Sequence, residues 1–396
     1  MTPRAASSFI SPEISPTLPP MFAPAQIQTL RKAVRARLLP WFVRNARDLP
    51  WRAEPRPPYA VWISEIMLQQ TRVDTVIPYF HRFLARFPDP AALAAAPLRD
   101  VLKLWEGLGY YTRARQIQKA AQLLVRDHGG QLPSDPAQLA ALPGLGPYTT
   151  AAVASFAFGH PLAVLDGNVI RVFARLLALP DDTGLPATKK KLQLLADALL
   201  LKDRPGAVNE AWMELGALIC TPRAPRCPAC PLRSVCRAAK LHTPEAFPNK
   251  KKKMKVPHKV VGAAVILNPK NRILIAQRKA EGGMLAGLWE FPGGKIAPGE
   301  TMPQCIAREL REEMGVVLEV GPHLVTVPHA YTHFTIELHA HFARIRSGRP
   351  RHIECADHAW VTRDQFDDYP FSKADLDIIR ALRALPAPPR YRDYFA

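Results

Sequence analysis

The sequence CTPRAPRCPACPLRSVC, residues 220–236, places four cysteines close together: Cys220, Cys227, Cys230 and Cys236. Their spacing is C-x6-C-x2-C-x5-C, and prolines stiffen the loops between them. Four thiolates in so short a stretch can enclose one metal centre, either an iron–sulfur cluster or a structural zinc ion. The long first gap is unlike the paired C-x2-C knuckles of most zinc ribbons, but residue types alone do not separate the two centres.

The composition describes a globular and strongly basic chain. It has 396 residues, of which 48% are hydrophobic and 22% charged, so we expect two or three domains with buried cores. The 53 Lys and Arg residues exceed the 34 Asp and Glu residues, which gives a net charge of +19 and a pI near 9.9. This charge favours a nucleic-acid partner, with an anionic membrane surface as the alternative. No apolar run is long enough to span a bilayer, and we expect a monomer that does not bind membranes.

Cysteine usage and the N-terminal residues indicate the compartment. Cys305 and Cys355 lie far from the other four cysteines in the sequence, which suits a reducing compartment better than a disulfide scaffold. We therefore expect a cytoplasmic, nucleoid-associated protein of bacterial type. The first residues are rich in Ser and Pro and are typical of a disordered tail. An organelle transit peptide is the alternative, and Met21 could be the true start.

The pattern along the chain changes once. Apolar positions first recur every three or four residues, which predicts helices. A basic linker containing the run Asn249–Lys255 follows, and after it the sequence alternates in the manner of strands around one predicted helix between Pro303 and Met314. The sequence thus predicts a multidomain protein with an all-α half followed by an α/β domain. The boundaries we expect are 1–24 for the disordered tail, 25–240 for the helical domain, 241–258 for the linker, 259–386 for the α/β domain and 387–396 for a C-terminal tail.

Two short segments of the helical half stand where the chain enters a helix. The sequence LPGLGPYT, residues 142–149, has glycines that permit a tight turn whose N–H groups can face a phosphate. It looks like the hairpin of a helix-hairpin-helix DNA-binding motif. In LDGNV, residues 165–169, Asp166 stands at a predicted N-cap. The macrodipole and the free N–H groups favour its ionised form there, although simple capping is the alternative role.

The order of these motifs resembles that of the endonuclease III superfamily of DNA glycosylases. Three upstream segments narrow the resemblance to the adenine DNA glycosylase family: DLPWR at 48–52, WISEIMLQQT at 62–71 and GLGYY at 107–111. The similarity covers nearly the whole chain from about residue 25 onward. It implies excision of a base from duplex DNA, and a [4Fe–4S] cluster that the four cysteines hold as a structural and DNA-contacting element.

One position discriminates within the superfamily. Members that also cleave the DNA strand carry a lysine just before the threonine of the hairpin helix, where this chain has Tyr148. A tyrosine cannot form the Schiff base that the lyase reaction requires, so the sequence predicts monofunctional base removal. An endonuclease III-like lyase acting on oxidised pyrimidines is the alternative, and this position argues against it.

Removal of adenine needs two carboxylates with different tasks. The nucleotide must first leave the base stack; a proton on the purine and a negative charge near the sugar then assist cleavage. The resemblance assigns proton donation to N7 to Glu65 and stabilisation of the oxocarbenium ion to Asp166. Glu65 lies among apolar residues, which predicts a raised pKa. Without the resemblance, an exposed helix glutamate would be the simpler interpretation.

The resemblance also assigns supporting roles, residue by residue. Tyr148 would pack against the sugar, and Asn168 would orient Asp166. Gln70 and Tyr110 would wedge into the base stack. The residues expected to contact the adenine or the DNA are Trp51, Arg52, Gln70, Tyr110, Gly144, Gly146 and Glu210.

The C-terminal half contains a complete Nudix box, GKIAPGETMPQCIARELREEMGV at residues 294–316. Glu309, Glu312 and Glu313 stand at positions i, i+3 and i+4 of the predicted helix, so their carboxylates share one face. Three clustered carboxylates repel one another unless a hard cation such as Mg²⁺ lies among them. A solvated acidic helix face is the alternative. The nearby segment LWEFPGGK, residues 288–295, also resembles the 8-oxo-dGTP pyrophosphatases.

This half departs from the usual pattern of the adenine DNA glycosylase family. In that family the Nudix-like domain typically has a degraded box and reads 8-oxoguanine instead of hydrolysing nucleotides. The segment HAYTH, residues 329–333, resembles the reading loop, and the resemblance assigns 8-oxoguanine recognition to Tyr331, Thr332 and His333. A reading loop and an intact box therefore coexist in one sequence.

The expected function is monofunctional removal of adenine paired with 8-oxoguanine or guanine in double-stranded DNA, with Mg²⁺-dependent Nudix hydrolysis as an open addition. One rival is an 8-oxo-dGTP pyrophosphatase that an inactive helical domain tethers to DNA. Glu65 and Asp166 argue against it, because a tether needs neither carboxylate. A further rival, a binding module without catalysis, predicts that function survives the loss of both Glu65 and Asp166.

Overall fold

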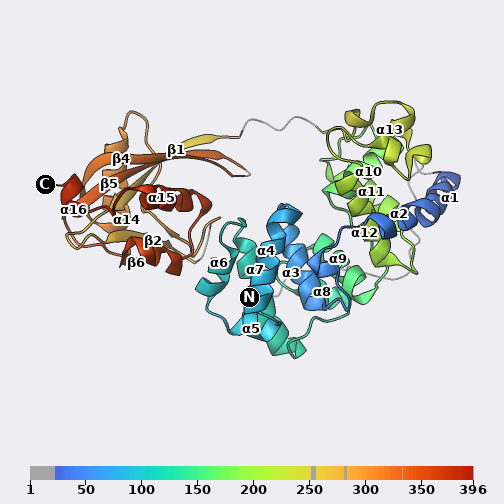
Figure 1. The fold of residues 1–396 in the computed structure, drawn as a ribbon, viewed down its shortest axis with the longest axis horizontal. Coiled ribbons are helices and arrows are strands. Elements are labelled where there is room, and N and C mark those ends of the chain that lie inside the picture. Colours follow the sequence, from blue (N-terminus) through green and yellow to red (C-terminus); the bar gives the residue numbers. More distant parts are fainter. Residues whose placement is uncertain (1–22, 251–255, 281–282, 332, 396) are drawn as a thin grey trace, which may run out of the picture. The chain divides into compact units, whose positions relative to one another are not determined.

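A computed structural model describes residues 23–250, 256–280, 283–331 and 333–395 of the chain (Figure 1). These residues form two compact units, and neither unit is one continuous stretch. The first unit comprises the described residues within Met1–Val61, Ser134–Ala140 and Leu145–Lys252. The second comprises the described residues within Trp62–Pro133, Ala141–Gly144 and Lys253–Ala396.

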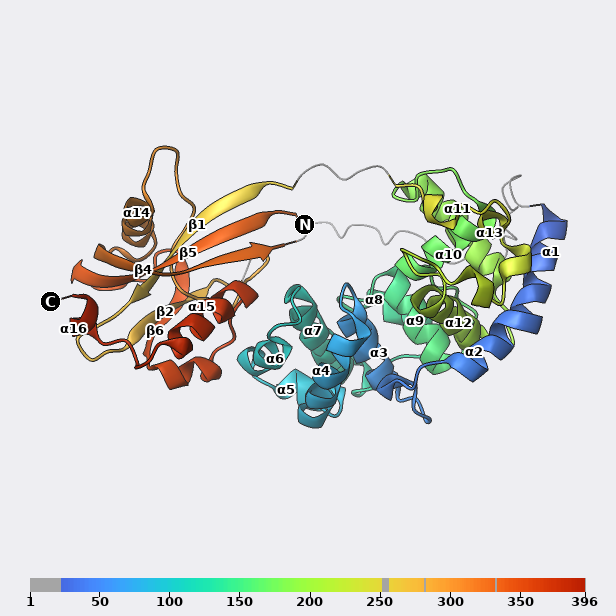
Figure 2. The ribbon, with the colours of Figure 1, turned by 45° about the horizontal axis from the view of Figure 1, so that its top comes forward.

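The first unit is a set of helices around one apolar core. Its N-terminal stretch runs through α1 (Pro24–Ala33), the π-helical η1 (Val34–Leu38) and α2 (Leu39–Asn45). Leu30, Val34 and Leu38 recur every four residues and are buried in the same core as the helices that follow residue 163. Figure 2 shows α1 and α2 beside these later helices. Those later helices, with the hairpin helices before them, are α8 (Pro136–Ala141), α9 (Pro147–Phe158), α10 (Gly167–Leu177), α11 (Pro186–Leu199), α12 (Pro205–Leu218) and α13 (Arg237–Lys240).

The helical part of the second unit is built around large aromatic side chains. The ring of Phe83 meets Phe87 edge-on at 5.1 Å and Trp105 at 5.9 Å between centroids, and all three side chains are fully buried. Aromatic pairs in this geometry stabilise a core beyond the effect of burial alone. The helices are α3 (Pro58–Leu68, in this unit from Trp62 on), α4 (Val73–Arg86), α5 (Pro90–Ala95), α6 (Leu98–Trp105) and α7 (Thr112–His128).

From His258 on, the second unit is a mixed α/β domain. Among its described residues the strands form two three-stranded sheets, in the orders β1–β5–β4 and β3–β2–β6. Strand β1 runs parallel to β5, and the other pairings are antiparallel. The elements are β1 (His258–Ile266), β2 (Ile273–Arg278), β3 (Trp289–Glu290), α14 (Met302–Met314), β4 (Val317–Ala330), β5 (Thr335–Ser347), β6 (Cys355–Val361), α15 (Lys373–Ala384) and α16 (Tyr391–Tyr394).

Strand β1 is apolar because both of its faces are covered. Ala263 and Val265 belong to the core that includes α15, whereas Ala264 and Ile266 belong to the core that includes α14. Neighbouring side chains of a strand point to opposite faces, so one apolar run serves two cores. The helix expected between Pro303 and Met314 is α14. The predicted order of a helical half followed by an α/β domain is confirmed.

Within the second unit, the turn before α7 contacts the strand-rich domain. The hydroxyl of Tyr111 donates a buried hydrogen bond of 2.9 Å to the carbonyl oxygen of Phe371. The carboxylate of Glu106 accepts from the N–H of Phe371 over 2.7 Å, and Lys103 Nζ donates to the carbonyl oxygen of Tyr369 over 2.9 Å. Burial raises the pKa of Tyr111, so its hydroxyl remains a donor at neutral pH.

Several expectations concern the ends of the chain and the linker. Residues 1–22 and 251–255 lie outside the described residues, so the disordered tail, the basic run and the exact domain boundaries stay predictions. We expected residues 387–396 to form a tail, but the described ones, 387–395, contain α16 and pack on the domain: Phe395 is buried and Tyr394 stacks on Phe342 at 3.9 Å. None of the helices in the described part of the chain combines the length and the apolar content that a membrane span requires.

Candidate active site and metal centres

Helix α3 carries the predicted proton donor in a segment that is buried almost throughout. Glu65 is only 4% exposed, and its neighbours Ile63 and Ile66 are buried as well. A carboxylate at this depth needs a polar partner to offset its lost hydration. Glu65 is therefore buried beside apolar neighbours in its helix, and an exposed helix glutamate is excluded.

Arg113 connects the end of α3 to the turn before α7. Its guanidinium donates to the carbonyl oxygens of Ile66 and Gln69, each over 2.7 Å, and to that of Gly109 over 3.0 Å. Burial lowers the pKa of Arg113 to about 10, which still leaves the group charged at neutral pH. One side chain thus fixes the ends of two segments.

The two predicted wedge residues lie on these fixed segments. Gln70 and Tyr110 both have left-handed backbones, with φ of +58° and +51°, a conformation that residues other than glycine rarely adopt. Tyr110 is 38% exposed, and the Arg113 guanidinium lies 5.4 Å from its ring centroid. The strained backbone and the exposed ring suit a side chain held ready for contact with a partner.

Asp166 is the N-cap of α10, as the sequence predicts. Its Oδ1 accepts from the N–H of Val169 over 2.7 Å, and its Oδ2 accepts from Nδ2 of Asn168 over 2.8 Å. We expected the helix N-terminus to favour the carboxylate. The hydrogen bonds do act in that direction, but burial has the larger effect and raises the pKa of Asp166 above its ordinary value. Both oxygens nevertheless have fixed positions.

Asn168 is itself held from two sides. Its Oδ1 accepts from Nη2 of Arg171 over 2.9 Å, so the amide nitrogen is left to face Asp166. A Cβ added to Gly216 would lie 2.6 Å from the Cβ of Asn168, which means that α12 approaches α10 closely at this point. A side chain larger than hydrogen at Gly216 would displace Asn168.

The hairpin residues Gly144 and Gly146 lie between α8 and α9. Gly144 has φ of +83°, and a Cβ there would come within 2.9 Å of the Cβ of Gln116, so glycine is required. Both glycines are exposed, and α9 begins directly after Gly146. This arrangement leaves the first N–H groups of α9 near a surface that a phosphate can reach. Tyr148, the second residue of α9, is partly exposed.

Arg52 and Glu210, which we expected to hold the adenine, are bonded to each other. Nε of Arg52 lies 2.8 Å from Glu210 Oε1, and its Nη2 lies 3.1 Å from Glu214 Oε2. Arg56 is a second partner of Glu210 at 2.9 Å, and Arg47 is a second partner of Glu214 at 2.7 Å. Burial would raise the pKa of Glu214, but the two arginines lower it below the ordinary value. A buried network of this kind has a structural role of its own.

Trp51 belongs to the short turn η2 (Pro50–Arg52) and is buried. Because it directly precedes Arg52 in the chain, it lies next to the ion-pair network of Arg52 and Glu210. The structure is therefore consistent with Trp51 as a simple core aromatic, and contact with adenine stays a prediction.

The four clustered cysteines line one cavity in the first unit, and all are free thiols. Nη1 of Arg175 donates to Sγ of Cys220 over 3.3 Å, and Sγ of Cys236 lies 3.4 Å from the carbonyl oxygen of Arg175. Burial raises the pKa of Cys230 to about 12, and the neighbouring thiols add to this effect. At neutral pH the thiol of Cys230 therefore ionises only when a metal supplies positive charge.

The spacing of the sulfurs distinguishes the two kinds of metal centre. A single tetrahedral zinc ion with Zn–S bonds of about 2.3 Å brings its four sulfurs within about 3.8 Å of one another. Among the described residues, the one group of three or more potential ligands whose ligand atoms all lie within 4.8 Å of one another contains no cysteine. The sulfurs of the cavity are thus too widely spaced for one zinc ion, and the donor set fits a cluster of several metal ions.

The Nudix box folds around Arg308. Its guanidinium pairs with Glu300 at 2.9 Å, with Glu309 at 3.0 Å and with Glu312 at 3.1 Å. A Cβ added to Gly294 would collide with the carboxylate of Glu309, so the absence of a side chain at Gly294 leaves the space that Glu309 occupies. Two of the three predicted metal ligands therefore share an arginine.

Glu313, the third predicted ligand, faces a different group of residues. It lines a cavity of about 150 Å³ together with Glu290, Glu354, Arg278 and others. Burial and the nearby carboxylates raise the pKa of Glu313 to about 8. In the described part of the domain, the three box carboxylates do not converge within 4.8 Å of one another. Carboxylates are the ligand type that a hard cation prefers. In the present arrangement, however, the three groups are too far apart to bind one cation together.

The reading loop lies next to a buried carboxylate of the same domain. Tyr331 packs against His329 and Phe334, with centroids 4.5 and 4.9 Å apart. Burial, with a contribution from Asp375, raises the pKa of Tyr331 to about 12. His333 is exposed, and Thr332 lies outside the described residues.

Sequence reasoning missed several residues that organise these sites. Arg113, Arg175 and Glu214 make long-range bonds, and no local motif marks them. Glu214 does carry one signal, because it stands four residues after Glu210 on a mostly apolar helix and so faces the same arginines.

Comparison with known proteins agrees with this division of the chain. Residues 63–197 match the family of HhH-GPD superfamily base excision DNA repair proteins, and residues 262–381 match the NUDIX domain. The adenine DNA glycosylase of Homo sapiens is 34% identical over 88% of this chain and 73% of its own length. That of Rattus norvegicus is also 34% identical, over 88% and 77%. A solved thermostable thymine-DNA glycosylase is 28% identical, with a TM-score of 0.49 over 55% of this chain and 98% of its own.

The helical half, its hairpin and its buried carboxylates define a DNA glycosylase of the helix-hairpin-helix class, joined to a Nudix domain. The identity to curated relatives over most of the chain makes the family assignment narrower. The chain belongs to the adenine DNA glycosylase family, and it is a base excision repair enzyme.

Proposed function

We propose that the enzyme removes adenine paired with 8-oxoguanine or guanine in double-stranded DNA, by hydrolysis of the N-glycosidic bond and without strand cleavage. The observation that carries the proposal is the fixed carboxylate of Asp166, whose two oxygens accept hydrogen bonds from Val169 and Asn168. A carboxylate held in this way can stabilise a positively charged sugar without reorganising during the reaction.

The two acids divide the reaction. Adenine is a poor leaving group, so Glu65 donates a proton to the purine ring once the nucleotide has left the stack. The burial of Glu65 supports this role, because a desolvated carboxyl group retains its proton more readily. Asp166 then faces the oxocarbenium ion, with Asn168 orienting it and Tyr148 packing against the sugar. With Tyr148 in place of a Schiff-base lysine, the reaction ends at base removal.

The discriminating experiment uses purified protein and four duplexes, bearing A:8-oxoG, A:G, A:T or thymine glycol. Each is incubated with the enzyme and analysed with and without alkali. Strand breaks at adenine that appear only after alkali, in the A:8-oxoG and A:G duplexes, are the expected result. Cleavage without alkali, or activity on thymine glycol, would overturn the proposal in favour of the lyase.

We propose further that Cys220, Cys227, Cys230 and Cys236 hold a [4Fe–4S] cluster. The wide spacing of their sulfurs and the apolar cavity that they line support this choice over zinc. The cluster would supply structure and no electron-transfer step, since hydrolysis of an N-glycoside involves no redox change. Arg223 and Arg226 lie in the first cysteine gap, where they can contact phosphates.

A second candidate function belongs to the Nudix box. Burial and then repulsion by nearby carboxylates raise the pKa of Glu313, and a bound cation would offset that repulsion. We therefore propose that Glu309, Glu312 and Glu313 bind Mg²⁺, with Arg308 giving up its contacts to the first two.

The test of the Mg²⁺ site is a calorimetric titration of full-length protein with Mg²⁺, alongside pyrophosphate release from 8-oxo-dGTP. Glu312→Gln is the test variant, and Glu319→Gln, which changes a glutamate paired with Arg344 at 2.8 Å, is its control. Heat that disappears only in Glu312→Gln supports a metal site, and pyrophosphate release lost in the same variant adds a hydrolase. If both the heat and the pyrophosphate release are absent from the wild type, Arg308 has replaced the cation.

A further inference from the structure

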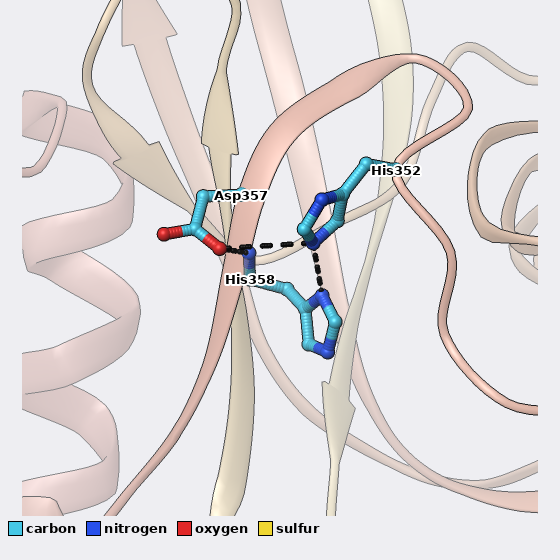
Figure 3. Close-up of side chains that lie close together, drawn as sticks. All are labelled: His352, Asp357 and His358. Atoms are coloured by element: carbon cyan, nitrogen blue, oxygen red, sulfur yellow. Dashed lines mark hydrogen bonds and ion pairs between the residues drawn. The ribbon is translucent and has the colours of Figure 1, made fainter.

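A group of three side chains that takes no part in the reaction lies at the start of β6. His352 belongs to the loop between β5 and β6, whereas Asp357 and His358 belong to β6 itself (Figure 3). Nε2 of His352 lies 2.7 Å from Nδ1 of His358 and 3.6 Å from Oδ1 of Asp357. Among the described residues, this is the one group of three potential metal ligands whose ligand atoms all lie within 4.8 Å of one another.

A bulge in the sheet explains how two neighbours on one strand reach the same point. Side chains of successive strand residues normally point to opposite faces. Strand β6 pairs regularly with β2 up to Gln277 and Asp357, and the register then shifts so that Arg278 faces Cys355. A bulge turns the side chains next to it, and the carboxylate of Asp357 accepts a hydrogen bond of 2.8 Å from the N–H of its neighbour His358.

Between the two rings, at least one nitrogen presents a lone pair that can bind a metal ion. Nitrogens 2.7 Å apart cannot both carry a proton between the rings. Burial, followed by the proximity of His352, lowers the pKa of His358, although Asp357 acts in the opposite direction. A neutral imidazole presents a lone pair to a cation. A bound ion would take the place of the shared proton, and the donating ring would move its proton to its other nitrogen.

We propose that His352, Asp357 and His358 bind a divalent transition-metal ion of the zinc type, with a fourth position open to water. Two imidazoles and one carboxylate are a ligand set that zinc accepts. Ligand bonds of about 2.0–2.1 Å in a tetrahedron place neighbouring donor atoms about 3.3 Å apart. The separation of 3.6 Å between His352 and Asp357 already fits this spacing, and the two imidazoles need to part by only about 0.6 Å. The ion would tie the loop before β6 to the strand.

This site is distinct from the metal centres proposed above. Its donors are nitrogen and oxygen, unlike the thiols of the first unit, and none of its three residues belongs to the Nudix box. The histidine pair His323 and His339, in the same domain, is a matched control. Its ring centroids are 6.1 Å apart, and the hydroxyl of Thr326 lies between the two rings, so these nitrogens do not converge on one point.

The experiment is equilibrium dialysis of the full-length protein against Zn²⁺ in excess Mg²⁺, with zinc and iron both measured by elemental analysis. A constant iron content shows that the cysteines have not taken up the zinc. We expect one zinc ion per chain in the wild type, an affinity at least about tenfold weaker in His352→Ala, Asp357→Asn and His358→Ala, and no change in His323→Ala/His339→Ala. Each variant is checked for retained glycosylase activity, which confirms that it folds.

Thermal unfolding gives a second reading of the same site. Zinc that binds only the folded state raises the melting temperature, and this rise should be absent from His352→Ala/His358→Ala. Equal zinc binding by that double variant and the wild type would overturn the proposal. A wild-type dissociation constant weaker than about 100 µM, which corresponds to a binding free energy near −5.5 kcal/mol, would also overturn it by identifying an ordinary surface histidine pair.

Discussion

Nδ2 of Asn168 donates a hydrogen bond of 2.8 Å to Oδ2 of Asp166, and Arg171 holds the other end of the same amide. This bond favours the ionised carboxylate, while burial opposes it. The balance between the two determines at which pH Asp166 can stabilise a cation. Asn168 is therefore a positioning residue with an effect that a pH profile can detect.

We expect Asn168→Ala to lower the single-turnover rate of adenine release by about 10- to 100-fold, with little effect on duplex binding. Loss of the hydrogen bond raises the pKa of Asp166 further, so the rate should begin to fall at a higher pH as the solution is acidified. Asn45→Ala, which removes an amide bonded to the carbonyl oxygen of Trp41, is the control. A rate lowered equally at every pH would indicate a purely structural role for Asn168.

Glu65→Gln should abolish adenine release while duplex affinity stays nearly intact. The variant keeps the size of the side chain but removes the acid, and general acid catalysis typically supplies about 100- to 10,000-fold. Single-turnover kinetics on A:8-oxoG with binding measured in parallel tests the role. If the variant keeps more than about a tenth of the wild-type rate, Glu65 is not the acid.

The purified enzyme should be brown and contain iron and sulfide in stoichiometric amounts. Cys227→Ser should impair folding or DNA affinity more than the chemical step, because the four cysteines line one cavity in the helical first unit. Cys355→Ser, a cysteine outside that cavity, should leave iron content and affinity unchanged. Stoichiometric zinc in anaerobically purified protein would contradict the cluster assignment.

Tyr331→Ala/His333→Ala should reduce activity on A:8-oxoG far more than on A:G. The contacts that this loop makes are expected only with the oxidised base, so the ratio of the two single-turnover rates reports them. His258→Ala, at the start of β1, is a control in the same domain. Equal losses on both duplexes would show that the loop contributes only general affinity or stability.

Asp375 should make the stability of the C-terminal domain depend on pH. Burial, with a contribution from Glu290, raises its pKa to about 7. The folded state then holds this proton more tightly than the unfolded state. The contribution of Asp375 to the free energy of unfolding is therefore greatest below about pH 4 and is lost as pH rises to about 7. This one group changes the free energy of unfolding by up to about 1.4 kcal/mol per pH unit, and the change ends above about pH 7.

Urea unfolding of the full-length protein at several pH values, compared with Asp375→Asn, isolates this contribution. The asparagine retains the side-chain oxygen that accepts from the N–H of Phe291 over 3.0 Å but cannot titrate. The difference in unfolding free energy between the two proteins should therefore change between pH 4 and 7. A constant difference would show that Asp375 does not carry the shifted pKa.

The parts of the site that could be predicted from the sequence are those fixed by neighbours in the chain. Asp166 caps α10 because its side chain needs only the N–H groups of the next three residues. Helix α14 follows from its own pattern, and the residue types of the box mark it without any structure. These features depend on interactions across a few residues, which a sequence displays directly.

The parts that could not be predicted depend on partners far along the chain. Arg113 gains its role from carbonyl oxygens of residues 66–69, and a backbone acceptor leaves no mark in a sequence. The spacing of the Nudix carboxylates correctly places them on one helix, but it does not reveal that Arg308 takes two of them while Glu313 faces Glu290. The bulge in β6 likewise appears only once the register with β2 is known.

The discontinuous first unit sets the order in which the protein matures during synthesis. Arg47 and Glu214, joined by an ion pair of 2.7 Å, are separated by 167 residues, which a ribosome adds in about 8–33 s at about 5–20 residues per second. Until then the apolar stripe of α1 and η1 lacks the helices that bury it, whereas residues 62–133 emerge as one continuous stretch. The nascent N-terminal helices are therefore an exposed apolar segment on the ribosome, of the kind that chaperones shield while the rest of the chain is made.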